Sequence, residues 1–243
     1  MELAYVLHTR PWRETSTLAE LLSVSEGRIG VVARGARRGR RGAVSPLRPF
    51  VRLRCSWGGR GELRTLTAAE PEQAIALAGD ALFAGLYLNE LLMRLLQRQD
   101  AHPELFLLYA RALTRLGAGA SELEPALREF ERGLLDELGY GFPLEIDTTG
   151  APILADRRYR FVVDGGLAPV ATGGVERADV AEGDPTGESA GDALFPGSRL
   201  LAFAEGDFRE DATRRAAKRL MRLALAPHLG DRPLHSRALF RGR

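Results

Sequence analysis

The chain has 243 residues, of which 45% are hydrophobic, enough to bury a core in one large domain or two ordinary ones. No stretch of about eighteen apolar residues is free of charge, and the N-terminus lacks a charged start followed by an apolar segment, so the sequence predicts a cytoplasmic protein. Cys55 is the only cysteine, which excludes an internal disulfide and any zinc site built from several thiolates.

The formal net charge of +2 hides an uneven distribution. Residues 1–79 carry 13 basic and 7 acidic groups, 80–198 carry 10 and 20, and 199–243 carry 11 and 5, so the ends are each +6 and the middle is −10. The most one-sided stretch is 28–64, with eleven arginines and a single acidic residue, Glu62. Both ends can therefore face a polyanion.

Residues 1 to about 69 read as short strands separated by turns. Strands are expected over 2–9, 15–22, 28–34, 51–57 and 62–67. In the fourth, Val51, Leu53, Cys55 and Trp57 share one face while Arg52 and Arg54 lie on the other. Five short strands predict a small closed barrel, because closure removes exposed sheet edges. An OB-fold fits this count, and an SH3-like barrel fits almost as well.

After Pro71 the pattern becomes helical. The segment 80–98 is apolar on several sides and is expected to be the central helix of an all-α bundle. Further helices are expected over 102–116, around 127–138 with a stop at Gly139, over 198–204, and from Asp211, a predicted N-cap, to 225 before Pro227. The fold class is therefore α+β, with a barrel domain over 1–78 and a helical domain over 79–243.

Two parts of the helical domain depart from this pattern. Residues 140–175 are rich in glycine and proline and contain short β-like pieces, which predicts a small irregular lobe. Residues 176–192 are acidic and have almost nothing to bury, which predicts a flexible loop.

The predicted helix from Asp211 carries its basic and its apolar side chains on opposite faces. At 100° per residue, its cations fall within about 140° of arc and alanines and leucines fill the opposite side. The cations are Arg214, Arg215, Lys218, Arg219 and Arg222. A solvated helix face and a nucleic-acid contact explain this pattern equally well.

Catalysis finds little support in the sequence. None of the four histidines forms a metal-ligand spacing with a second His, Cys or carboxylate, and no glycine-rich segment fits a P-loop or a dinucleotide fingerprint. Cys55 lies on the apolar face of its strand and is expected to be a core residue. We therefore expect no catalytic residue, no metal and no cofactor.

Nucleic-acid binding is better supported, because arginines adjoin the strands of a small barrel and can contact phosphates, with Trp12, Phe50 and Trp57 nearby as stacking candidates. Trp57 alternates with core residues and is expected to be buried. The predicted DNA-binding residues are Arg34, Arg37, Arg38, Arg40, Arg41, Arg52, Arg54, Arg214, Arg215, Lys218 and Arg222.

Several segments together resemble the RecO family of bacterial recombination mediators. The segments that resemble the family are LHTRPWRETS at 7–16, ARGAR at 33–37, GLYLNELL at 85–92, LREFE at 127–131, LGYG at 138–141, and the basic helix followed by PLHSR at 233–237. These segments run along essentially the whole chain in the family's order.

The resemblance implies an N-terminal OB-fold, a helical C-terminal domain and no enzymatic turnover. RecO-like proteins bind single- and double-stranded DNA, anneal complementary strands, and act with RecR to load RecA onto DNA covered by single-strand-binding protein, whose acidic tail they contact. By position, Arg34, Arg37 and Arg38 match the basic DNA-binding loop. Arg128 looks like the residue that meets the tail carboxylate, beside Leu127 and Phe130. The implied location is the cytoplasm, in association with the nucleoid.

One departure from the family is plain. Many relatives carry a zinc site of four cysteines after the Gly-Tyr-Gly segment, and here the first pair falls at Asp147 and Gly150. The lobe is thus expected to be a degenerate, zinc-ribbon-like element without metal. The alternative reading of the whole protein is an interaction adaptor, in which the helical domain binds an acidic peptide and the barrel docks a partner without contacting DNA.

Overall fold

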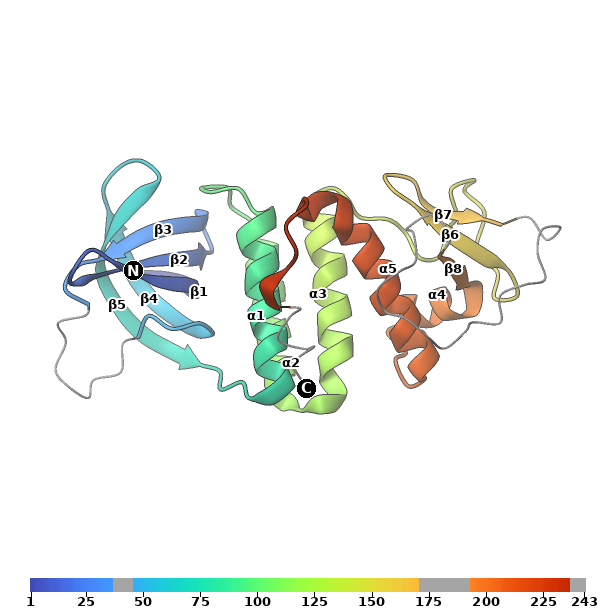
Figure 1. The fold of residues 1–243 in the computed structure, drawn as a ribbon, viewed down its shortest axis with the longest axis horizontal. Coiled ribbons are helices and arrows are strands. Elements are labelled where there is room, and N and C mark those ends of the chain that lie inside the picture. The colour runs from blue at the N-terminus through green and yellow to red at the C-terminus, as the bar shows by residue number, and fades with distance from the viewer. Residues whose placement is uncertain (37–45, 171–192, 237–243) are drawn as a thin grey trace. The chain divides into compact units, whose positions relative to one another are not determined.

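The structure is a computed structural model, and it describes residues 1–36, 46–170 and 193–236 (Figure 1). The chain forms two compact units. One comprises residues 1–130 together with the segment that starts at Asp231, and the other comprises residues 131–230. The predicted domain boundary between residues 78 and 79 remains a prediction.

The N-terminal strands form a closed barrel (Figure 1). They are β1 (Glu2–Trp12), β2 (Ser16–Ser23), β3 (Gly27–Ala33), β4 (Val51–Gly58) and β5 (Leu63–Ala74). The strand order is β1-β2-β3-β5-β4, in which β3 and β5 run parallel and the other neighbours run antiparallel. The expected OB-fold is confirmed, since a five-stranded Greek-key barrel is its defining architecture.

The interior of the barrel is filled by alternate residues of its strands. On β4, Val51, Leu53 and Cys55 are buried and Arg52 and Arg54 face outward, so the predicted alternation is confirmed. Burial raises the pKa of the Cys55 thiol to about 11, with a smaller contribution from Glu2. The cysteine is thus a core residue, as expected.

Three helices follow the barrel: α1 (Gly79–Leu95), α2 (Pro103–Ala118) and α3 (Leu123–Glu137), with a short 3-10 turn, η1 (Ala120–Glu122), before α3. Pro103 stands in the first turn of α2, where its missing N–H has no helical partner to lose. The predicted stop of α3 is confirmed. Gly139 has a φ of +79°, and the Tyr140 amide donates to the Leu135 carbonyl at 2.8 Å.

Helices α1 and α2 pack on the outside of β1 in the first unit. The buried Asn89 side chain donates to the Leu7 carbonyl at 2.8 Å and accepts from the Tyr109 hydroxyl at 2.5 Å. The Tyr5 ring lies 5.1 Å from the Tyr109 ring, edge to face. These hydrogen bonds give the buried Asn89 amide and Tyr109 hydroxyl their partners, so they fix the position of α1 and α2 on β1.

The C-terminal segment returns to α1. Glu90 accepts hydrogen bonds from the amides of His235 and Ser236 and from the Ser236 hydroxyl, at 2.9, 2.8 and 2.7 Å. Arg94 pairs with Glu90 and donates to the carbonyls of Arg232 and Pro233. These bonds, with the buried Leu234, fasten residues 232–236 to the first unit.

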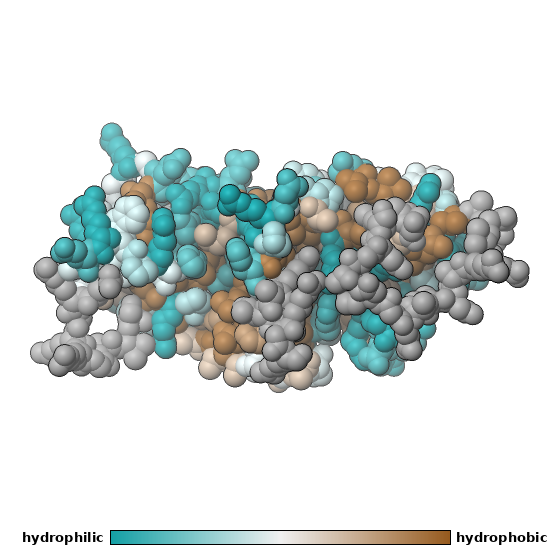
Figure 2. Space-filling view, in the orientation of Figure 1, coloured by the Kyte–Doolittle hydropathy of each residue, from teal (hydrophilic) through white to brown (hydrophobic). Residues whose placement is uncertain are grey.

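The second unit contains the predicted lobe. Strands β6 (Arg158–Val162), β7 (Gly166–Pro169) and β8 (Leu194–Pro196) form a sheet of order β7-β6-β8. Tyr159, Leu167 and Phe195 form its buried face. Val162 and Leu194 are exposed, and hydrophobic surface is visible in the region of the lobe in Figure 2. The predicted acidic loop, 176–192, lies outside the described residues.

Helices α4 (Gly197–Ala204) and α5 (Asp211–Leu229) complete this unit. Two details of the prediction for α5 were wrong. Glu210, with extended backbone angles, is the N-cap and Asp211 is the first helical residue. Pro227 lies inside the helix, which continues to Leu229. Among the described residues, no helix combines the length and the apolar character needed to cross a membrane.

Candidate nucleic-acid interface

The strand directions bring the β1–β2 turn and the β3–β4 connection to the same end of the barrel. Strands β1, β3 and β5 finish at this end, and β2 and β4 begin there. We call it the arginine end and define it by Arg10, Trp12, Arg13, Arg34 and Arg48. All four arginines are exposed. The barrel therefore gathers cations from three sequence segments onto one end.

Only part of the predicted basic loop falls among the described residues. Arg34 is exposed in the turn that follows β3. Arg37, Arg38, Arg40 and Arg41 belong to residues 37–45, which lie outside the described ranges. The residues on either side of this segment, Ala36 and Pro46, are described.

Arg52 and Arg54 point outward from β4, as the alternation predicts, but both are paired. Arg52 Nε lies 3.2 Å from one carboxylate oxygen of Glu72, and Arg54 donates to the other at 3.4 Å. Two cations share one carboxylate, so the cluster keeps one net positive charge. The face of β4 is less cationic than its sequence indicates.

Other arginines of the 28–64 stretch hold the barrel together. Arg28 donates to the Met93 carbonyl, and its Nε lies 3.8 Å from the buried carboxylate of Glu20. Arg64 donates to Glu26 at 2.7 Å. Buried or half-buried guanidinium groups of this kind have lost most of their water and their freedom to reach a ligand. We therefore assign these two arginines to structure.

The outer surface of β1 and β2 is covered by the protein itself. Tyr5, Leu7, Leu18 and Leu22 alternate with the interior residues, yet each is buried. Beside them, Arg98 pairs with Glu20 on the outer face, close to Gly30 of β3. OB-folds commonly bind oligonucleotides on the face of their second and third strands. Here that face is largely occupied, which leaves the arginine end for a ligand.

The three aromatic candidates have different surroundings. Phe50 is buried against Gly85 of α1. The Trp57 indole is half-buried and donates to Glu26 at 2.9 Å at the opposite end of the barrel. Trp12 is half-buried like Trp57, with the Arg10 guanidinium 5.6 Å from its ring centre. Trp12 is distinguished by its place at the arginine end, where Phe50 is buried and Trp57 is absent.

In the second unit, α5 presents the predicted cationic face. Its opposite side is buried through Ala217, Leu220 and Ala224, as expected, and through Met221. Arg215, Lys218 and Arg222 are exposed. Arg214 is half-buried and donates to the Phe208 and Arg209 carbonyls and to Asp211, so it mainly secures the start of the helix.

The predicted tail-binding residues lie on α3. Arg128, Leu127 and Phe130 are all buried, and Arg128 is only 4% exposed. Arg128 Nε lies 3.8 Å from Glu124 one turn earlier. A ligand carboxylate can reach this guanidinium only if neighbouring side chains move.

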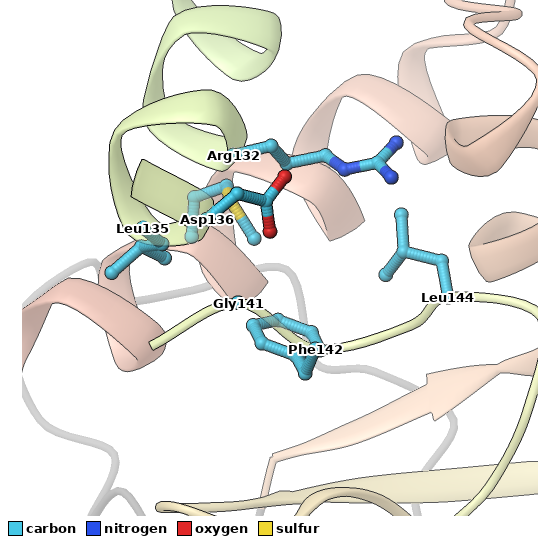
Figure 3. Close-up of a pocket in the computed structure, with 7 residues that line it drawn as sticks. Arg132, Leu135, Asp136, Gly141, Phe142 and Leu144 are labelled. Carbon is cyan, nitrogen blue, oxygen red and sulfur yellow. The ribbon is translucent and has the colours of Figure 1, made fainter. Parts of the chain in front are cut away.

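A small pocket of the second unit lies one turn further along α3 (Figure 3). Arg132 and Asp136 extend from the helix into its wall, and Phe142 and Leu144 come from the segment that follows. The Arg132 guanidinium lies 5.5 Å from the Phe203 ring centre. The cavity is about 10 Å³, room for roughly one water molecule, and Asp136 adds a carboxylate to its wall. A peptide that ends in a hydrophobic residue and a carboxylate can therefore reach Arg132 only if the surrounding side chains move. The sequence motif draws attention to Arg128, so Arg132 is a candidate that the sequence alone did not name.

The described residues contain no cluster of three His, Cys, Asp or Glu side chains able to hold a metal. The residues at the family's first zinc pair do not fit a metal. Gly150 has no ligand atom, and one oxygen of the Asp147 carboxylate accepts from the Thr149 amide, the Thr149 hydroxyl and the Ala151 amide at 2.8, 2.6 and 3.2 Å. Hydrogen bonds to Asp147 organise this turn in place of zinc.

Comparisons with known proteins find the same family along the whole chain. The family model described as "Recombination protein O N terminal" matches residues 1–75, and that described as "Recombination protein O C terminal" matches residues 77–238. A protein named DNA repair protein RecO from Stutzerimonas stutzeri is 50% identical over 98% of this chain and 92% of its own length. Those from Pseudomonas aeruginosa (strain LESB58) and Methylococcus capsulatus are each 47% identical, over 100% and 99% of this chain and 95% and 93% of their own lengths.

Proposed function

The chain belongs to the RecO family of DNA repair proteins, and on that premise we propose that it is a non-enzymatic, DNA-binding mediator of recombination. It binds single- and double-stranded DNA, anneals complementary strands, and with RecR assists the loading of RecA onto DNA covered by single-strand-binding protein. Its place of action is the cytoplasm, on nucleoid DNA.

The observation that carries the DNA-binding proposal is the arginine end of the barrel. Four exposed arginines lie at this end: Arg10 in β1, Arg13 in the turn after it, Arg34 after β3 and Arg48 before β4. The sequence between Arg34 and Arg48 carries four further arginines. Phosphate contacts of this kind release counterions and supply sequence-independent affinity. No base-reading helix or strand is required for annealing, because the complementary strand provides the sequence information.

The salt dependence of binding tests this proposal. If about four arginines contact phosphates, the slope of log K against log salt on single-stranded DNA is about −3. The double variant Arg37→Ala with Arg38→Ala flattens it by about one unit or more. An unchanged slope in that variant removes the loop from the DNA site. Annealing of complementary strands coated with single-strand-binding protein then tests the mediator role.

We further propose that α3 binds the acidic tail of single-strand-binding protein. The predicted residues Arg128, Leu127 and Phe130 and the pocket beside Arg132 are two candidate positions on the same helix. A tail peptide distinguishes them: Arg132→Ala weakens its binding if the pocket is the site, whereas only Arg128→Ala does so if the buried position opens. Arg111→Ala, on exposed α2 surface, serves as a matched loss of one cation.

The Arg132 pocket also favours the second candidate function, an adaptor that binds an acidic peptide and does not contact DNA. The two functions differ in one measurement on the full chain. An adaptor binds the tail peptide with an affinity that Arg132 controls and shows no salt-dependent affinity for free single-stranded DNA. A mediator binds both ligands.

A further inference from the structure

The two tryptophans of the chain lie at opposite ends of the barrel. Trp57, at the end of β4, is fixed by its hydrogen bond to Glu26. Trp12, at the end of β1, makes a cation–π contact with Arg10. The β1–β2 register pairs Trp12 with Ser16 and Arg10 with Leu18. Since Leu18 points away from the barrel interior, Arg10 and Trp12 both lie on the outer face, two residues apart.

Arg34 follows closely on this row of residues. The β2–β3 register ends with Thr17 opposite Ala33, and Arg34 is the next residue, in the turn after β3; Ser16, the neighbour of Thr17, stands opposite Trp12. Neighbouring strands are about 4.8 Å apart, so an Arg34 backbone that continues the line of β3 would lie roughly 10 Å from that of Trp12. Ser16 between them is small and buried, so it raises no barrier to a ligand that spans both.

We propose that Trp12, held by Arg10, is a stacking platform for an unpaired base, and that Arg34 contacts a phosphate of the same strand. This inference rests on the proposed DNA-binding function and adds a preference to it. Bases of a duplex are stacked on one another and cannot leave to meet the indole, whereas those of single-stranded DNA can. Trp12 therefore favours single strands, while the arginines bind both forms.

The geometry suits this role for two reasons. The Arg10 guanidinium lies over the indole and limits its rotation, so less side-chain freedom is lost when a base binds. The exposed Arg13 follows Trp12 directly in the turn after β1 and adds a cation to the same end of the barrel. Stacking on an aromatic side chain tolerates any base, as a protein that anneals arbitrary sequences requires.

Fluorescence tests the proposal directly, because the chain has only two tryptophans. In full-length protein carrying Trp57→Phe, Trp12 is the sole indole. We expect unlabelled oligo(dT) to quench its emission at saturation and a blunt duplex of equal length to leave it nearly unchanged. In the reciprocal Trp12→Phe protein, the remaining Trp57 is expected to report no quenching by either DNA.

Affinity gives the second readout, measured by anisotropy of labelled DNA. Trp12→Ala is expected to weaken single-strand binding by roughly five- to a hundredfold and duplex binding by less than about twofold. Trp12→Phe keeps a ring and retains most of the affinity, and circular dichroism melting verifies that both variants fold. Equal losses on the two DNAs, or no loss on single strands, overturn the platform while the DNA-binding function stands. Failure of the wild-type protein to bind either DNA overturns both.

Discussion

The shared carboxylate of Glu72 allows a direct test of whether the outer face of β4 contacts DNA. Arg52 and Arg54 together carry two positive charges, of which Glu72 neutralises one. Replacement by glutamine keeps the size and a hydrogen-bonding oxygen but removes the negative charge. Glu72→Gln therefore changes the net charge of the cluster from +1 to +2 and leaves both guanidinium groups in place.

The expected effect follows from counterion release. One additional neutralised phosphate on single-stranded DNA steepens the slope of log K against log salt by about 0.7. Between 50 and 200 mM salt, a fourfold change, this corresponds to about 2.5-fold more loss of affinity than in the unchanged protein. The fold itself is little affected, because a surface ion pair contributes about 0–1 kcal/mol and Arg54 is largely exposed.

The assay is anisotropy of a labelled oligo(dT) at four salt concentrations. If the face of β4 lies on the DNA path, Glu72→Gln binds more tightly at low salt with the steeper slope, and Arg54→Ala shifts the slope the opposite way. Glu104→Gln on α2 serves as the control, because Glu104 is an exposed carboxylate on another element, whereas Glu70 stands directly opposite Arg54 in the β4–β5 register. Identical slopes for Glu72→Gln and the unchanged protein refute the assignment of Arg52 and Arg54 to the DNA site.

Three further predictions concern the contacts that hold each unit. Tyr109→Phe leaves the buried Asn89 oxygen without its donor and is expected to lower the free energy of unfolding in urea by about 1–3 kcal/mol. Asp147→Ala is expected to lower the melting temperature, whereas a chelator is not. Hydrogen bonds from Thr149 lower the pKa of Asp147. The contribution of this carboxylate to stability is therefore present above its ordinary pKa of about 3.9 and is lost as pH falls through the lower folded value. Burial raises the pKa of Glu90, but the bonds from Ser236 and His235 and the charge of Arg94 outweigh it and lower the pKa, so the contribution of this carboxylate is present above the ordinary value of about 4.3 and is lost as pH falls through the lower folded value. At neutral pH, Glu90→Gln is expected to accelerate hydrogen exchange at the Ser236 amide relative to the unchanged protein.

Local patterns were sufficient to predict most of the elements. The alternation at 51–57 gave the inward and outward faces of β4, because a strand has a period of two whatever surrounds it. The glycine that ends α3 was equally readable, because a left-handed residue is needed there. At α5 the same reasoning misplaced both ends. Asp211 is a common N-cap residue, but the backbone of Glu210 takes that position, and Pro227 is tolerated in the last turns.

The candidate site was harder to predict, because it depends on which residues meet across strands. Nothing in the spacing of Arg52, Arg54 and Glu72 along the chain shows that one carboxylate serves both cations. Nor does the spacing of Arg10 and Arg34 show that the barrel brings them to one end. Both the sharing of Glu72 and the grouping of Arg10 with Arg34 depend on the order of the strands in the closed barrel, which local composition does not give.

The 28–64 stretch illustrates how burial divides a charge pattern that looks uniform in the sequence. Arg28 and Arg64 have acidic partners and little exposure, so a polyanion that bound them would first have to break those contacts. Arg34 and Arg48 are exposed at the arginine end, and neither forms an ion pair with another residue that the structure describes. Arg60, in the turn between β4 and β5, is exposed as well, but at the opposite end. For the proposed DNA partner, affinity counts only charges that can displace counterions, and of these three exposed arginines two lie at the arginine end.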